Sequence, residues 1–91
     1  MNLSMPFAMQ MVEELSTILS QHINFIDKEG VIIASSDQQR IGSVHMGAKK
    51  LIQENLPYIV IESDLEYPGS KQGVNLPIVV DDEIIGVIGI T

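Results

Sequence analysis

The stretch that decides the fold is Arg40-Ile41-Gly42-Ser43-Val44-His45-Met46-Gly47-Ala48. It contains the only arginine of the chain and one of its two histidines. Ser43 is a residue type that favours the N-cap of a helix, so a helix is predicted to begin there. A helix N-terminus, a guanidinium and an imidazole all favour anions, so the stretch also predicts an anion-binding corner.

Short apolar runs on both sides of this stretch predict β-strands. Before it, 23–26 and 31–35 are joined by a turn ending at Gly30, which predicts a hairpin. After it, the helix carries Val44, Ala48, Leu51 and Ile52 on one face and ends at Asn55, ahead of Pro57. Three more strands are then predicted at 58–61, 73–80 and 83–91, the last two joined by a tight turn at Asp81-Asp82.

The N-terminal segment predicts a further helix. Ser4 is a suitable N-cap and Pro6 is tolerated in a first turn. Apolar residues then recur at helical spacing, namely Phe7, Met11, Leu15 and Ile18. This wide apolar face covers the sheet or, in part, contacts a second copy of the chain.

Together these elements predict an α+β sensor domain of PAS or GAF type. Its core is a central five-stranded antiparallel sheet, with an N-terminal helix and a second helix between strands 2 and 3. The 91 residues are expected to form one domain, 1–91, with no linker. The strand 83–91 is apolar on both faces and is expected to be central and covered on both sides.

Composition excludes several classes of function. The net charge of −7 argues against direct binding of nucleic acid or of an anionic membrane surface. The chain has no cysteine, no basic residue in positions 1–6 and no apolar run of about 20 residues. These features are expected of a cytoplasmic protein without disulfides, signal peptide or membrane span.

The anion-binding corner rests mainly on Arg40. Its guanidinium can hold a carboxylate through two parallel hydrogen bonds, and Gly42 lets an anion approach the backbone closely. His45 can donate a hydrogen bond when neutral or add charge when protonated. In the alternative interpretation, Arg40 is a solvated cation that pairs with Asp37.

A second candidate segment is 73–78. Pro77 lacks an N–H, so it interrupts a strand ladder and leaves neighbouring backbone groups free, whereas Asn75 offers a donor and an acceptor suited to hydroxyls. The alternative is an edge strand protected by its proline. Three glycines, Gly47, Gly86 and Gly89, mark either close packing of helix and strand or space for a ligand.

A search for catalytic residues finds none. The carboxylates at 81–83 are adjacent in a turn and point apart, and His22 is expected to be a strand-edge residue. The histidines His22 and His45 lack the spacing of a metal site, and no glycine-rich phosphate loop is present. We therefore expect neither an enzyme nor a metal or cofactor.

Five segments in order resemble the sugar diacid recognition domain, the N-terminal sensor domain of carbohydrate diacid regulators, which are bacterial transcription factors. They are Ile23-Asn24 through Asp27; Gly30 with Ile32-Ile33-Ala34-Ser35; Arg40-Ile41-Gly42 with His45 and Gly47-Ala48; Gly73-Val74-Asn75-Leu76-Pro77-Ile78; and Ile84-Ile85-Gly86-Val87-Ile88-Gly89-Ile90-Thr91. The resemblance covers nearly the whole chain. Met46 departs from the polar residue expected there, and the 62–72 loop, which is expected to be mobile, matches no family segment.

The resemblance implies a non-catalytic sensor of a small hydroxylated carboxylate such as glucarate, galactarate or glycerate. It implies a DNA-binding region outside this chain. A homodimer is expected from the wide apolar face of the N-terminal helix. Ligand contact is expected at Arg40, Gly42, Ser43, His45, Asn75, Leu76 and Pro77. The alternative is a dimerisation module of the same PAS-like fold, without a small-molecule ligand.

Overall fold

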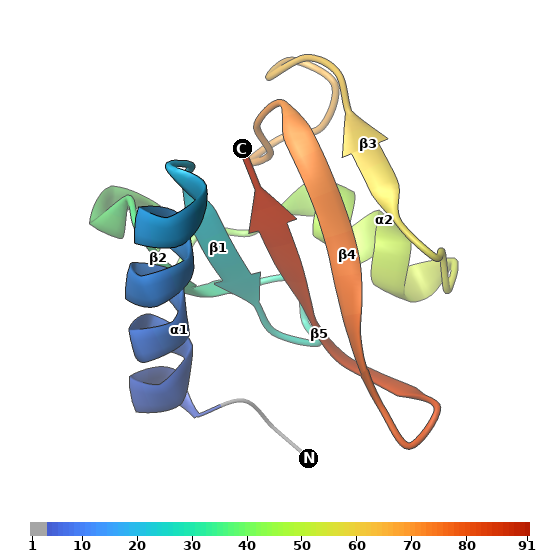
Figure 1. The fold of residues 1–91 in the computed structure, drawn as a ribbon. Helices are drawn as coiled ribbons and strands as arrows, with labels where there is room; N and C mark the ends of the chain where they lie inside the picture. The colour runs from blue at the N-terminus through green and yellow to red at the C-terminus, as the bar shows by residue number, and fades with distance from the viewer. Residues whose placement is uncertain (1–3) are drawn as a thin grey trace.

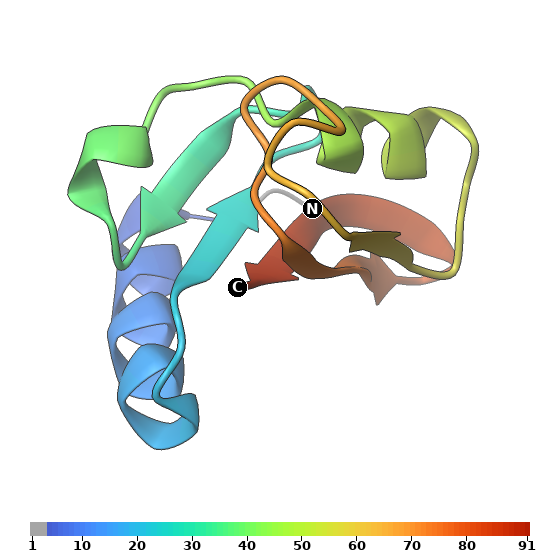
Figure 2. The ribbon, with the colours of Figure 1, turned by 90° about the horizontal axis from the view of Figure 1, so that it is seen from above.

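Two helices lie on opposite faces of one antiparallel sheet (Figures 1 and 2). The computed structural model describes residues 4–91, so the sequence-based statement about positions 1–3 lies outside it. The elements are α1 (Met5–Leu19), β1 (Ile23–Ile26), β2 (Ile32–Ser35), the 3₁₀ turn η1 (Gln38–Arg40), α2 (Met46–Gln53), β3 (Ile59–Ile61), β4 (Gly73–Val80) and β5 (Glu83–Ile90). The predicted α+β architecture is confirmed.

The sheet has five strands in the order β2-β1-β5-β4-β3, so β5 is central, as predicted. It pairs with β1 on one side and with β4 on the other. The β4–β5 hairpin turns at Asp81 and Asp82, whose φ angles of 52° and 63° are those that a two-residue turn between twisted strands requires. The last strand of this hairpin, β5, thus joins β1 from the first half of the chain to β4 from the second half.

Each helix covers its own part of the core. The α1 side of the sheet buries one apolar cluster, and the α2 side buries another, as alternation of side chains along strands requires. The α1 cluster contains Ala8, Val12, Ile23, Phe25 and Ala34. The α2 cluster contains Ile26, Ile32, Ala48, Leu51, Ile59 and Val87.

The α1 helix does not cover the whole of its face. It contacts β1 and β2, and in Figure 2 it lies beneath those two strands and away from β3 and β4. Three apolar side chains of the uncovered strands are therefore exposed: Val60 at 45%, Val74 at 38% and Leu76 at 39%. We call these three residues the open apolar patch.

Element boundaries differ from the sequence prediction mainly at α2. Its N-cap is His45 and not Ser43. The Ser43 hydroxyl donates to the carbonyl of Arg40, three residues before it, and so closes a turn ahead of the helix. The strands β2 and β3 each begin one residue later than predicted, at Ile32 and Ile59. Within residues 4–91, no helix is long and apolar enough to cross a membrane.

Candidate functional site

A cavity of about 170 Å³ lies at the end of the sheet where β1 begins and β5 ends. The main-chain N–H of Thr91 donates to the carbonyl of His22 (3.0 Å), which holds these two chain segments together. Five residues line the cavity: His22, Asp37, Arg40, Lys71 and Thr91. They come from β1's start, the η1 turn, the 62–72 loop and the end of β5.

Arg40 is held over this cavity by its position at the end of η1 and by one hydrogen bond. Its Nη2 donates to the carbonyl of Gly69 (2.8 Å), in the 62–72 loop. Burial lowers the pKa of Arg40 from its ordinary value, against the opposing effect of the carboxylates of Asp37 and Asp64. A guanidinium has five N–H donors, so a half-buried Arg40 retains donors for an anion.

The cavity concentrates positive charge in an acidic protein. Two of the five basic side chains in the sequence, Arg40 and Lys71, line it, against one carboxylate, that of Asp37. Asp37 accepts a hydrogen bond from the main chain of Gln39 (3.2 Å) and thereby caps η1. It forms no ion pair with Arg40 in the part of the chain that the structure describes. The predicted alternative of an Arg40–Asp37 pair is therefore not what the structure contains.

His45 lies close to this cavity but is buried, with 1% of its surface exposed. Its Nδ1 accepts from the main-chain N–H of Ala48 (2.9 Å) and lies 3.2 Å from the Ser70 hydroxyl. Burial lowers the pKa of His45 to about 4, and the positive charge of Arg40 acts in the same direction. His45 is therefore neutral at pH 7, with Nδ1 as the acceptor and Nε2 as the N–H donor.

The N-terminus of α2 is closed by the protein itself. The main-chain N–H groups of Met46 and Gly47 donate to the carbonyl of Pro68 (3.1 Å) and to the hydroxyl of Ser70 (2.9 Å). The next N–H, of Ala48, donates to His45 as described. The sequence predicted free N–H groups here for an anion, but each of these three is already paired. An anion at this site is therefore attracted by side chains and not by the helix end.

The 62–72 loop supplies most of these partners and has a defined internal structure. Asp64 accepts from the main chain of Gln72 (2.7 Å), and Glu66 accepts from the main chain of Glu62 (3.0 Å). Gly69 packs against the main chain of Val44, where an added Cβ would lie 1.9 Å from the carbonyl oxygen. The loop thus joins Arg40 to the start of α2.

The remaining residues predicted to contact ligand are placed differently. Gly42, whose φ is +94°, and Ser43, whose amide donates to the carbonyl of Arg40 (3.1 Å), are both exposed and follow Arg40 directly in the chain. Asn75 is buried on the α2 face, on which β4 also places Pro77, whereas Leu76 belongs to the open apolar patch on the other face.

The interruption predicted at Pro77 is not observed. Pro77 remains in register with Val87 of β5, and β3 pairs only with Gly73–Asn75. Pro77 therefore lies where β4 has one neighbouring strand, which is the predicted edge-strand alternative. Gly47 likewise follows the packing alternative, because an added Cβ would lie 2.5 Å from Cδ1 of Ile61.

Four residues of the cavity were not predicted as site residues: His22, Asp37, Lys71 and Thr91, of which Asp37 was named only as an alternative partner of Arg40. They are far apart in sequence, and only the pairing of β1 with β5 and the course of the 62–72 loop bring them together. A usable signal was Lys71 itself, because it is a lone cation in an acidic loop.

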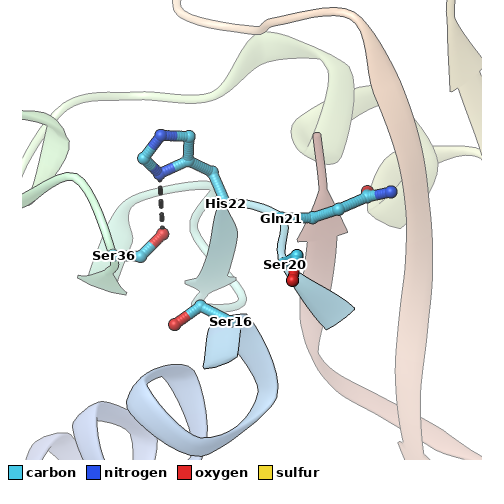
Figure 3. Close-up of a pocket in the computed structure, with 5 residues that line it drawn as sticks. All are labelled: Ser16, Ser20, Gln21, His22 and Ser36. Carbon is cyan, nitrogen blue, oxygen red and sulfur yellow. Dashed lines mark hydrogen bonds between the residues drawn. The ribbon is translucent and has the colours of Figure 1, made fainter. Parts of the chain in front are cut away.

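A second, shallower hollow of about 290 Å³ also includes His22 (Figure 3). It is lined by hydroxyl and amide side chains from the end of α1, with Ser36 beside the imidazole (His22 Nδ1 to Ser36 Oγ, 2.9 Å). No lysine or arginine lines it, so it is less suited to a carboxylate than the Arg40 cavity.

Comparison with known proteins gives a consistent result. The sequence model of the family described as "Putative sugar diacid recognition" matches residues 3–91. The carbohydrate diacid regulator of Escherichia coli (strain K12) is 34% identical over 91 residues, covering 99% of this chain and 24% of that protein. YsfB of Bacillus subtilis (strain 168) is 28% identical over 85 residues, covering 92% of this chain and 23% of YsfB. The chain spans less than a quarter of the length of each of these relatives.

Proposed function

The chain belongs to the sugar diacid recognition family, and on that premise we propose that it senses a small hydroxylated carboxylate without transforming it. The observation that carries the proposal is the Arg40 cavity. It joins a half-buried guanidinium and the Lys71 ammonium in a chain whose net charge is −7. Partial burial strengthens the attraction between Arg40 and an anion, because solvent screens it less.

In this proposal, Arg40 holds one carboxylate through the donors that Gly69 does not use. Lys71 adds charge, and the hydroxyl of Thr91 and the imidazole of His22 offer hydrogen bonds to the rest of the ligand. Gly42 and Ser43 form the outer side of the site. His45 contributes by holding the loop and α2 in place, and its Nε2 remains a possible donor.

The ligand class follows from the family and from the size of the cavity. Sugar diacids of the glucarate and galactarate type, and the smaller glycerate, offer carboxylates together with hydroxyls. A cavity of about 170 Å³ is small compared with the ~300–1,000 Å³ of typical ligand pockets, which favours a short, polar ligand. In this proposal, ligand binding is signalled in the cytoplasm to a DNA-binding region outside this chain. The name of the E. coli relative, a regulator, supports this part of the proposal.

Thermal denaturation with added acids tests this proposal. Glucarate, galactarate or glycerate at 100 times its Kd is expected to stabilise the chain by about 2.7 kcal/mol. Arg40→Ala should abolish the shift, whereas Lys28→Ala, which removes an exposed cation in the β1–β2 turn, should leave it unchanged. The proposal fails if none of the acids stabilises the wild-type chain, or if Arg40→Ala responds as well as wild type.

The open apolar patch supports a second candidate function, a dimerisation module. Val60 and Val74 are cross-strand neighbours, and both are more than one-third exposed. Exposed apolar side chains that adjoin one another favour self-association. Sedimentation of the wild type and of Val74→Thr across a range of concentrations tests this function. It requires that the wild type self-associate more strongly than Val74→Thr. It also requires that added acids leave the thermal stability unchanged.

A further inference from the structure

A row of polar side chains crosses the buried α2 face of the sheet. Asn24 of β1 is opposite Ser35 of β2 on one side and Gly89 of β5 on the other, and Gly89 is opposite Asn75 of β4. Asn24, Ser35 and Asn75 are 1–2% exposed. Three polar side chains in an apolar sheet are costly unless their hydrogen bonds are satisfied.

Two atoms of this row are not satisfied. The Ser35 hydroxyl and the Asn24 Oδ1 form a hydrogen bond, which directs the Asn24 amide nitrogen away from Ser35. Within residues 4–91, neither Nδ2 of Asn24 nor Oδ1 of Asn75 has a partner, although both are buried. Buried unpaired polar groups are rare in proteins, so this pair requires an explanation.

Gly89 lies between the two unpaired atoms. A Cβ added to Gly89 would lie 2.7 Å from Asn75 Oδ1 and 3.7 Å from Asn24 Nδ2. The missing side chain therefore lets Asn75 Oδ1 lie against the backbone of β5, on the same side as Asn24 Nδ2, so that a donor and an acceptor converge at Gly89. The glycine is therefore required by the packing of Asn75, and the two unpaired atoms beside it are what point to a ligand.

The chemistry of the pair selects its occupant. Asn24 Nδ2 only donates and Asn75 Oδ1 only accepts, so the group between them must both accept and donate. A hydroxyl does both with one oxygen, as does a water molecule, and the ligand-bound crystal structure separates the two. A carboxylate cannot donate to Asn75, and an ammonium cannot accept from Asn24.

This point lies near the Arg40 cavity. His22 and Thr91, which line the cavity, lie just beyond the ends of β1 and β5, where the Thr91 N–H donates to the His22 carbonyl. His22 is two residues from Asn24, and Thr91 is two residues from Gly89. Residues two apart on a strand project to the same face and are separated by about 6.5–7 Å. A ligand whose carboxylate contacts Arg40 thus reaches the amide pair with a hydroxyl a few carbons away.

We infer that Asn24 and Asn75, on either side of Gly89, form a buried subsite that recognises one hydroxyl of the ligand. The inference rests on the proposed function and extends it, because Arg40 binds any carboxylate whereas this subsite separates hydroxylated acids from their deoxy analogues. Asn24 is the residue that this inference adds to the site, and Ser35 is the residue that orients it.

The test compares acids that have the same carbon chain. Calorimetric titration measures the affinities of glucarate and of adipate, its analogue without hydroxyls, and those of glycerate and propionate as a second pair. The variants are Asn24→Leu, which removes the donor and keeps the volume, and Gly89→Ala, which keeps both amides but places a Cβ 2.7 Å from Asn75 Oδ1 and so displaces that acceptor. Gln53→Leu removes an exposed amide from α2 and serves as the control.

The wild type is expected to prefer the hydroxylated acid by at least about tenfold, and each variant to reduce that preference about tenfold, because one buried hydrogen-bonded hydroxyl is lost. Gln53→Leu should keep the preference. If Asn24→Leu destabilises the fold, Gly89→Ala alone decides. The subsite is refuted if folded Gly89→Ala keeps the wild-type preference. It is also refuted if, in the ligand-bound crystal structure, an ordered water and no ligand hydroxyl lies between the two amides. If wild type binds none of the four acids, the proposed function itself fails and the subsite with it.

Discussion

The N-terminus of α2 and the Arg40 cavity lie side by side but differ in whether their polar groups have hydrogen-bond partners inside the protein. At the helix end, the N–H groups of Met46, Gly47 and Ala48 all have partners inside the protein. At the cavity, Arg40 uses one of its donors on Gly69, and in the α2 face of the sheet one amide atom of Asn24 and one of Asn75 have no partner among residues 4–91.

This difference separates scaffold from site. A polar group that is satisfied internally stabilises the fold, because breaking its bond leaves a buried group unpaired at a cost of about 1–3 kcal/mol. A polar group that is left unpaired in the folded protein is available to a ligand. Substitutions at the helix end should therefore change stability, and substitutions at the cavity should change binding.

The largest expected effect is on stability, at His45. His45→Ala should lower the free energy of unfolding by at least about 3 kcal/mol, because the loss of an N-cap costs about 1 kcal/mol and an emptied buried volume about 2 or more. Urea denaturation measures this. His45→Asn, which keeps an N-capping oxygen, should lose less; equal losses for both variants would show that capping is not the role of His45.

The second effect is a dependence of stability on pH. The folded protein has a His45 pKa of about 4, below its ordinary value of 6.5, so the unfolded chain binds this proton more readily. The stabilisation is complete above pH 6.5 and is lost as the pH falls towards 4, by an amount approaching about 3 kcal/mol.

The free energies of unfolding of wild type and His45→Asn at pH 7 and pH 4.5 measure this contribution as a difference between the two proteins. The advantage of wild type in free energy of unfolding should shrink at the lower pH. An advantage that is constant across this range would contradict the assignment.

The third effect tests the packing between α2 and β3. Gly47→Ala places a Cβ 2.5 Å from Ile61 Cδ1 and 3.1 Å from Ser70 Oγ. Overpacking costs about 1–3 kcal/mol, and the gain in helix propensity is about 1 kcal/mol, so a net loss of about 1–2 kcal/mol is expected in urea denaturation. A variant more stable than wild type would mean that this contact is loose.

The smallest effects distinguish the charges around the cavity. Lys71→Gln should weaken carboxylate binding a few-fold, and Asp37→Asn, which keeps the cap of η1, should strengthen it a few-fold. Both effects should decrease in high salt. Titration of each variant with the same acid at low and high salt measures this; changes of the same sign would place the anion elsewhere.

The sequence predicted the elements well because their signals are local. Alternation, turn residues and caps lie within a few positions of each other, so both hairpins, the helix order and the central position of β5 were predictable. The start of α2 was not, because Ser43 has the residue type of a cap but its hydroxyl is used by Arg40, and His45 takes that role.

Only part of the candidate site could be predicted, because most of its residues are brought together by contacts between distant segments. Arg40 was conspicuous as the only arginine, and its position beside an anion-sized cavity follows from the fold. His22 and Lys71 reach the cavity through strand pairing and a loop, and Asn24 enters the proposed subsite through strand pairing, which no local pattern encodes. Asn24 did carry one signal, since it is a polar residue inside the apolar run Ile23–Ile26.

The measurement that tests the account most directly is the crystal structure of the chain grown with saturating glucarate or glycerate. We expect density for a carboxylate within hydrogen-bonding distance of the Arg40 guanidinium, with Lys71 nearby and a ligand hydroxyl between Asn24 and Asn75. A ligand bound in the hollow beside Ser36, or at the closed N-terminus of α2, would contradict the account.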